Sequence, residues 1–364
     1  MIRLLSIIFI LGFATTAPAL EAEKEAQNES GTLLFDVSSK SFFDNLEFYN
    51  DIQKGYTLTG FNVEPRLAYT MGSRAKISGG FHMLSFFGEE TITRVVPVLT
   101  IQTQLTPNLT LNIGNVDALE RHGMPEPLYK PEREFTHQPE GGFQFLYNSD
   151  RFVADAWLNW EAFLFPNDTI QEEFTAGFSG RVVLSRGNGF NVEVPLYAIA
   201  IHKGGQINVT DERVTSLGNF GSGINFFVNV DEGKRLGLEG IFIIGKDFSP
   251  NPHHVYQNGW AVYPKMYFKT SAWFINAGYW RASEMMLPRG QEIFGSVSTV
   301  RTELNNPERE LLTGSAFYSK DVAKGFNLTF GTQLYYDIRN PILDFRFSII
   351  ARFNDSFLIN RNNR

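Results

Sequence analysis

The chain is dominated by a two-residue alternation of apolar and polar side chains, and its clearest example lies near the C-terminus. In residues 342–354 one parity holds Leu343, Phe345, Phe347, Ile349, Ala351 and Phe353, and the other holds Asp344, Arg346, Ser348 and Arg352. Successive side chains of a β-strand point to opposite faces, so this segment predicts a strand with one apolar and one charged face. A soluble sandwich would bury the apolar face in protein, whereas a membrane barrel would turn it to lipid and the charged face to a wet lumen.

The same alternation recurs along most of the chain, in segments whose length of roughly ten to fourteen residues suits a tilted membrane-spanning strand. The predicted strands cover residues 42–51, 55–69, 74–87, 93–105, 108–117, 139–148, 151–163, 173–185, 188–202, 217–230, 236–248, 258–269, 271–283, 310–319, 324–337 and 342–354. The pattern therefore predicts an all-β protein of about sixteen strands.

The connections between these segments alternate in length. Every second connection is a tight turn, such as residues 70–73 and 105–108, and most of the others are longer, notably 118–138, 203–216 and 284–309. Short turns on one rim and long loops on the other are typical of an outer-membrane barrel, and a sandwich has no reason to sort its loops in this way. We therefore expect a transmembrane antiparallel up-and-down β-barrel.

The N-terminus predicts export. Residues 1–19 combine Arg3, an apolar run over 4–13 and small residues before the expected cleavage site, as a signal peptide does. Residues 20–41 are interpreted as a periplasmic lead-in and 42–364 as the barrel, with 354–364 following the last clear strand. No later segment offers about eighteen consecutive apolar residues, so a membrane-spanning form must be a closed barrel.

Composition narrows the possible functions. The formal net charge of −7 argues against nucleic-acid binding, for which a basic surface would be needed. The absence of cysteine excludes a thiolate metal site and a cysteine nucleophile. Neither a metal site nor a cofactor is expected.

With its signal peptide, alternating strands and two kinds of loop, the chain resembles Gram-negative outer-membrane β-barrel proteins of the porin type. The resemblance implies a place in the bacterial outer membrane, contact with its lipid, insertion by its assembly machinery and a homotrimer as one possible state. It also implies a third external loop folded into the lumen as a constriction, which here is 117–138. The mixed charges of that loop are Glu120, Arg121, Glu126, Lys130, Glu132, Arg133 and Glu134, and an exposed surface loop is the alternative.

The charged residues of the lumen parity are predicted to line a pore. They are Glu47, Glu64, Arg66, Lys76, Asp155, Glu161, Arg181, Glu193, Glu239, Lys265, Asp344, Arg346 and Arg352. Opposed charges on a pore wall can orient and select a passing solute, so the leading hypothesis is a water-filled channel for passive diffusion of small hydrophilic solutes. The alternative is a salt-bridged ladder that fills a closed lumen.

The sequence predicts no catalytic residue and hence not an enzyme. There is no Gly-x-Ser-x-Gly motif, and His82, the histidine placed clearly in a predicted wall, has the lumen parity. The adjacent His253 and His254 are interpreted as solvated loop residues rather than metal ligands. Two other functions stay open. One is a barrel enzyme acting on lipid, which would require a serine–histidine pair on the outer face; the other is a secreted, soluble β-rich carbohydrate-binding protein.

Overall fold

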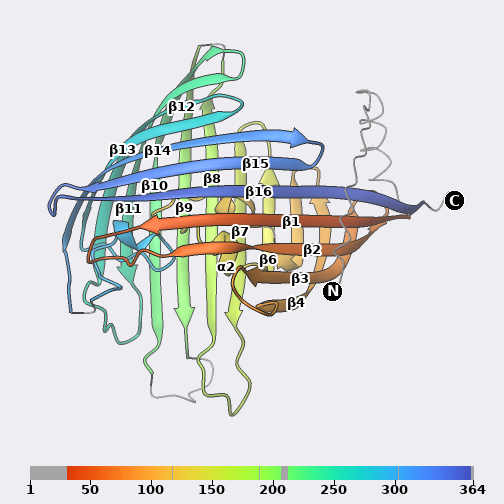
Figure 1. The fold of residues 1–364 in the computed structure, drawn as a ribbon, viewed down its shortest axis with the longest axis horizontal. Coiled ribbons are helices and arrows are strands. Elements are labelled where there is room, and N and C mark those ends of the chain that lie inside the picture. The colour runs from red at the N-terminus through yellow and green to blue at the C-terminus, as the bar shows by residue number, and fades with distance from the viewer. Residues whose placement is uncertain (1–30, 117, 188, 206–211, 302, 362–364) are drawn as a thin grey trace, which may run out of the picture.

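The computed structural model describes residues 31–116, 118–187, 189–205, 212–301 and 303–361, so the predicted signal peptide lies outside the described residues. Sixteen strands form one closed antiparallel barrel, in which each strand pairs with the next and β1 pairs with β16 (Figure 1). The predicted fold class and strand number are confirmed.

The strands have the following bounds: β1 (Thr32–Glu47), β2 (Thr57–Met71), β3 (Ala75–Phe86), β4 (Arg94–Thr106), β5 (Leu109–Val116), β6 (Glu140–Asn148), β7 (Phe152–Ala162), β8 (Glu173–Ser185), β9 (Phe190–Lys203), β10 (Thr215–Asp231), β11 (Lys234–Asp247), β12 (Asn258–Lys269), β13 (Trp273–Ser283), β14 (Glu308–Ala323), β15 (Phe326–Asp337) and β16 (Ile342–Arg361). Three short helices lie in the long loops: η1 (Leu119–Gly123), α2 (Arg133–Thr136) and η2 (Glu292–Phe294). Among the described residues, no helix has the length and apolarity needed to cross a membrane.

The two strands that close the barrel are longer than the sequence pattern indicated. Strand β1 begins at Thr32, inside the predicted lead-in, and β16 continues to Arg361, through the segment interpreted as a tail. These extensions pair with each other, from Thr32 with Arg361 to Ser38 with Asn354. The sequence analysis missed both extensions because their apolar–polar alternation is short and polar. They form strands because they pair with each other.

The predicted parity is confirmed in the last strand. Phe347 and Ile349 are 39% and 42% exposed on the outer face, whereas Arg346 on the inner face is 4% exposed. The same sorting puts Leu67, Leu99 and other apolar side chains on the outside of the barrel, where an outer-membrane protein meets lipid.

The inside of the barrel contains a hydrophobic core, which the sequence analysis did not predict. Three connections from the long-loop rim, 48–56, 117–139 and 284–307, contribute buried residues to it, and α2 is seen within the barrel outline in Figure 1. The loops supply Phe48, Met124, Leu128, Tyr129, Met285, Ile293 and Phe294, and the inner faces of the strands supply Leu46, Trp157, Ile199, Ile241, Ile243, Ala261, Tyr263, Trp280, Ala282, Leu311 and Tyr335. We call the described residues of 117–139 and 284–307 the plug loops.

Candidate functional site

Twelve of the thirteen predicted pore residues lie on the inner face of the barrel, and Glu47 does not. Asp36, Lys40 and Asp44 set the inward parity of β1, so Glu47 falls on the outer face, where it pairs with Phe345. The prediction for Glu47 is therefore wrong, because β1 began ten residues earlier than expected and its parity had been taken from too short a segment.

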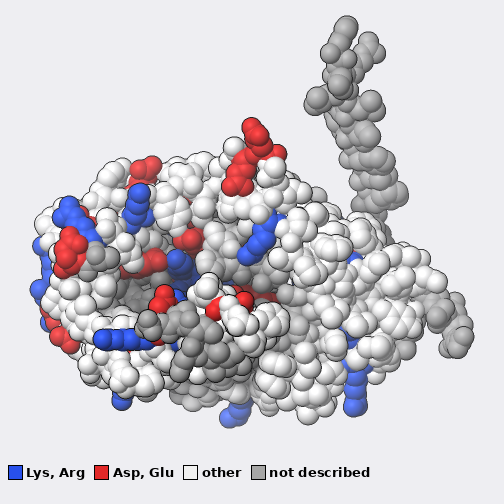
Figure 2. All heavy atoms as spheres, turned by 90° about the horizontal axis from the view of Figure 1, so that it is seen from below, with Lys and Arg blue, Asp and Glu red and all other residues white. Residues whose placement is uncertain are grey.

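The inner charges are mostly paired rather than free. Ion pairs join Arg66 to Glu64 (2.7 Å), Lys76 to Asp36 (2.9 Å), Arg181 to Glu193 (3.7 Å), Lys265 to Glu239 (2.6 Å), Arg346 to Asp44 (2.6 Å) and Arg352 to Glu134 (2.9 Å). Asp155 accepts hydrogen bonds from Gln144, and Asp344 accepts them from the backbone of Tyr49 and the side chain of Asn50. Acidic and basic side chains also mix around the hollow seen in Figure 2. These paired charges agree with the alternative in which ion pairs line a closed lumen, and not with a wall of free charges.

The predicted constriction loop lies inside the barrel and is bound to its wall. Glu134 pairs with Lys40 (2.7 Å) as well as with Arg352, and Arg133 pairs with Glu161 (2.8 Å). Both Lys40 and Arg352 lie on the strands that close the barrel.

The same loop also contacts β15 and two other connections. Glu126 accepts hydrogen bonds from Gln333 (2.8 Å) and Tyr335, Lys130 pairs with Glu292 (2.8 Å), and Glu132 accepts one from Tyr56. Arg121 lies in η1 with a φ of 57°, and the side chain of Glu120 is outside the described part of the structure.

A buried histidine fastens the plug loop to β6 and β7. His122 Nδ1 lies 2.7 Å from Asp155 and Nε2 lies 3.3 Å from Glu140, while the imidazole stacks on Trp157 with ring centroids 3.7 Å apart. Burial lowers the pKa of His122, but hydrogen bonds to the two carboxylates outweigh burial and raise it to about 9. A charged imidazole with both nitrogens occupied is suited to holding structure and not to acting as a general base.

A serine–histidine pair lies on the opposite, outer side of the wall. His202 and Ser216 pair directly across β9 and β10, and Nδ1 of His202 is 2.8 Å from the Ser216 hydroxyl. Both side chains point outward, because Ile199 and Leu217, which have the opposite parity on the same two strands, are buried on the inner face. The pair lies at the ends of its strands on the rim that carries the long loops.

Aromatic side chains surround this pair. A surface pocket of about 880 Å³ is lined by His202, Ser216, Trp160, Phe174, Phe248, Glu172, Ala200, Ile201, Gly205, Val214 and Pro250. Phe174 packs beside His202 at a centroid distance of 5.1 Å and beside Trp160 at 5.3 Å. We call this the outer pocket.

Backbone hydrogen bonds fix Ser216. Its amide donates to Ser249 Oγ (3.0 Å), and its carbonyl accepts from the amide of Phe248 (2.7 Å). Ser249 in turn donates its amide to Asp247 (2.8 Å), whose other oxygen lies 2.9 Å from His254. His254 is therefore bound to a carboxylate, unlike the solvated residue that the sequence analysis expected.

The outer pocket was missed because it depends on strand register. His202 is the last residue of a predicted strand and Ser216 precedes the next predicted strand by one residue, so neither was assigned a face. One signal was present: His202 continues the parity of Ala198 and Ala200, which is the lipid-facing parity of β9.

This geometry is suited to nucleophilic catalysis. A serine hydroxyl within hydrogen-bond reach of a neutral imidazole can be deprotonated as it attacks a carbonyl carbon. Among the described residues, no group of three or more His, Cys, Asp or Glu side chains could hold a metal ion.

The fold is similar to that of solved outer-membrane channels. Pseudomonas aeruginosa OprD matches with a TM-score of 0.53 and 9% identity over 91% of this chain and 98% of that one. OccK2 from the same organism, solved in complex with glucuronate, gives 0.51 and 8% over 92% and 99%. A BenF-like porin from Pseudomonas fluorescens Pf-5 gives 0.50 and 8% over 90% and 99%. These likenesses confirm the porin-type barrel fold.

Family membership comes from the sequence itself. A comparison with curated proteins finds no match. The sequence profile described as "Lipid A 3'-O-deacylase-type" matches residues 23–362, nearly the whole chain. This match overturns the expectation that the protein is not an enzyme, because the family it identifies is an enzyme family. The chain belongs to the lipid A 3'-O-deacylase-type family of outer-membrane β-barrel proteins.

Proposed function

We propose that the protein is an outer-membrane esterase that removes the 3'-O-linked acyl chain of lipid A, with Ser216 as nucleophile and His202 as general base. The observation that carries this proposal is the 2.8 Å contact between Ser216 and His202 on the lipid-facing side of the barrel. An enzyme acting on a membrane lipid needs its reactive groups on that side, since the substrate reaches them by lateral diffusion. The family description supplies the substrate class.

The reaction follows from the two side chains. Ser216 Oγ attacks the ester carbonyl carbon while His202 takes the hydroxyl proton, and the bond to the sugar oxygen then breaks. His202 returns the proton to that oxygen, so that the deacylated lipid leaves as an alcohol. A water molecule, deprotonated by His202, then attacks the acyl-Ser216 ester; the bond to Ser216 Oγ breaks, His202 returns the proton to that oxygen, and a free fatty acid is released.

The walls of the outer pocket suit an acyl chain. Trp160 and Phe248 are 39% and 50% exposed and flank the pair with apolar surface that the chain can cover. Lys246 lies beside Phe248, with its ammonium 5.4 Å from the ring centroid, and can meet a lipid phosphate at this rim.

Glu172 is the acidic residue of the pocket lining and a candidate for orienting His202. It is 5% exposed, and its carbonyl accepts a hydrogen bond from Gly204 (3.0 Å), two residues beyond His202. Among the described residues, no hydrogen bond joins its carboxylate to the imidazole. We propose that this bond forms when lipid occupies the pocket, in line with catalytic contacts that tighten on substrate binding.

The test is deacylation of purified lipid A by the detergent-solubilised protein, followed by mass spectrometry. The wild type should release one acyl chain as free fatty acid, and Ser216→Ala and His202→Gln should each lose at least about a hundredfold in rate. Ser41→Ala and His253→Gln, which change an exposed serine and an exposed histidine outside the pocket, are the matched controls and should keep wild-type activity. Full activity in Ser216→Ala would refute the assignment.

A passive channel is the second candidate. It is favoured by a polar cavity of about 620 Å³ on the inner side of the wall, lined by the charged residues Glu64, Arg66 and Arg352 among others. The hydrophobic core between the plug loops and the wall weighs against a continuous water path. Planar-bilayer recording separates the candidates, since an esterase with a filled barrel should give no step conductance and a channel should.

A further inference from the structure

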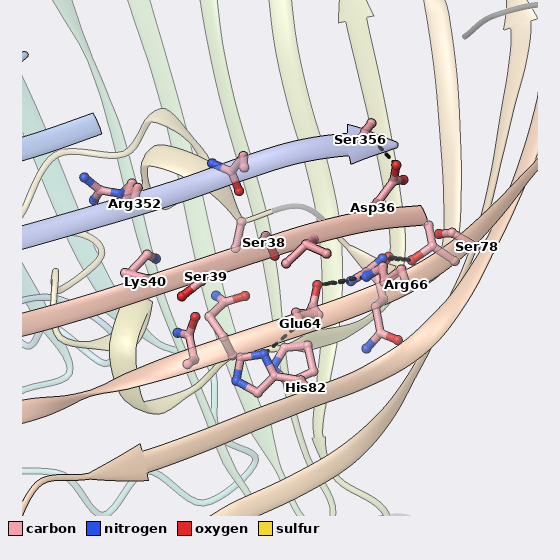
Figure 3. A pocket seen from close by; sticks show the side chains of 18 of the residues that line it. Asp36, Ser38, Ser39, Lys40, Glu64, Arg66, Ser78, His82, Arg352 and Ser356 are labelled. Carbon is pink, nitrogen blue, oxygen red and sulfur yellow. Dashed lines mark hydrogen bonds and ion pairs between the residues drawn. The ribbon is translucent and has the colours of Figure 1, made fainter. Parts of the chain in front are cut away.

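The polar cavity on the inner side of the wall, which we call the inner cavity, lies on the opposite face of the barrel from the outer pocket. Its volume is about 620 Å³, within the usual range for small-molecule sites. It extends from Lys324, Asn354 and Asp355 at the short-turn rim to Glu134 on the plug loop that forms its roof. Side chains from β1, β2, β3 and β16 converge on it (Figure 3).

The charges that line this cavity do not balance. Five cations, Lys40, Arg66, Lys76, Lys324 and Arg352, face four carboxylates, Asp36, Glu64, Glu134 and Asp355. The excess is localised at the roof, where the single carboxylate of Glu134 pairs with both Lys40 (2.7 Å) and Arg352 (2.9 Å). Both cations are on the wall and largely buried, and one carboxylate neutralises only half of their combined charge. An anion that enters the cavity could neutralise the other half.

The lining of the same cavity includes a buried histidine, His82. His82 is 3% exposed, and its Nδ1 lies 3.0 Å from Glu64, whose other oxygen is taken by Arg66. The Nε2 of His82 is buried and has no hydrogen-bond partner among the residues that the structure describes. With Nδ1 donating to the carboxylate, Nε2 of the neutral ring accepts a hydrogen bond, which a ligand hydroxyl can donate.

The remaining lining supplies neutral hydrogen-bonding groups. Asn62, Ser78, Thr100, Gln102 and Asn112 line the cavity together with the charged residues. Amide and hydroxyl groups of this kind both donate and accept, as recognition of a polyol requires.

We propose that this cavity binds a small hydroxylated organic anion that enters from the periplasmic side. Its carboxylate or phosphate is held by Lys40 and Arg352, and one hydroxyl donates to Nε2 of His82. The site is independent of the deacylase reaction, because the cavity and the outer pocket share no lining residue.

The test is isothermal titration calorimetry of the full-length protein in detergent with three probes. Gluconate carries both the carboxylate and the hydroxyls, glucose carries hydroxyls alone, and hexanoate carries a carboxylate alone. Gluconate should bind with a dissociation constant of about 1 mM and the other two at least about tenfold more weakly. No gluconate binding, or equal binding of all three probes, would overturn the proposal.

Two variants localise the site. Lys40→Met and His82→Gln should each weaken gluconate binding by about tenfold or more. Lys265→Met is the matched control, since Lys265 is also an inner-face lysine paired with a carboxylate (Glu239, 2.6 Å) but lies outside the cavity. Gluconate affinity that falls equally in the control would overturn the assignment. Ser216→Ala should bind gluconate like the wild type, which keeps this result separate from the proposed esterase activity.

Discussion

At the scale of single residues, the protein uses histidine in two different ways. His122 is enclosed by two carboxylates and an indole, so both ring nitrogens are bonded and the charged form is favoured. His202 has one nitrogen on a serine hydroxyl and lies in a surface pocket, where the lipid substrate that we propose could reach it. The surroundings, and not the residue type, separate a structural histidine from a candidate base.

The charged state of His122 makes the stability of the folded protein depend on pH. Its pKa is about 9 in the folded state and 6.5 in the reference state, so its contribution is fully present below about pH 6.5 and is lost as the pH rises through about 9. The contribution is on the order of 3 kcal/mol. In thermal unfolding between pH 6 and 10, His122→Gln should lower the midpoint strongly at pH 6 and much less at pH 10.

His253→Gln, which changes an exposed loop histidine, is the control for that experiment and should leave the midpoint unchanged at every pH. A difference between wild type and His122→Gln that stays constant across the pH range would mean that His122 contributes by packing alone.

At the scale of elements, the plug loops depend on close contact with each other. Lys130 donates its amide to the Arg289 carbonyl (2.9 Å), and Gln291 donates its amide to the Glu126 carbonyl (3.1 Å). Arg289 also pairs with Glu173 on β8 at 2.6 Å. These bonds join two segments that are more than a hundred residues apart in the sequence and hold both against the wall.

Gly290 permits this contact, and its substitution should weaken the plug. A Cβ at this position would lie 1.8 Å from the Pro127 carbonyl oxygen, so Gly290→Ala must push the loops apart. We expect a loss of stability of about 1–3 kcal/mol and faster hydrogen exchange in both loops. Gly240→Ala, where a Cβ meets nothing within 4 Å, is the control. Unchanged exchange in Gly290→Ala would show that the loops can separate without cost.

The elements show where prediction from sequence succeeded and where it stopped. The strands and their faces follow from local alternation, so they could be predicted. The plug could not be predicted from local alternation. One signal for it was present, since a water-filled lumen would leave the inward-facing apolar residues Ile241, Ile243 and Trp280 exposed to water. The pairing of His202 with Ser216 also needed the register between β9 and β10, which a single sequence does not supply.

At the scale of the whole molecule, the wall separates two chemistries. The outer face carries apolar side chains and the outer pocket, and the inner face carries ion pairs, the plug and the polar cavity. A closed barrel lets both exist without an exposed sheet edge. Whether copies of the barrel form a homotrimer, which small solutes meet it and which assembly factors insert it stay predictions.

Closure itself depends on the extensions of the first and last strands. Residues Asn354 to Arg361 pair with Thr32 to Ser38, and Ser356 donates a hydrogen bond to Asp36 (2.6 Å). Ending the chain after Phe353 would remove these partners and leave the first part of β1 with one unpaired edge, which a lipid environment penalises strongly. We expect this truncation to reduce the yield of folded, heat-modifiable barrel severely. Ending the chain after Arg361 removes no pairing partner in the described structure and is the control; equal yields from the two truncations would show that residues 39–353 alone close the barrel.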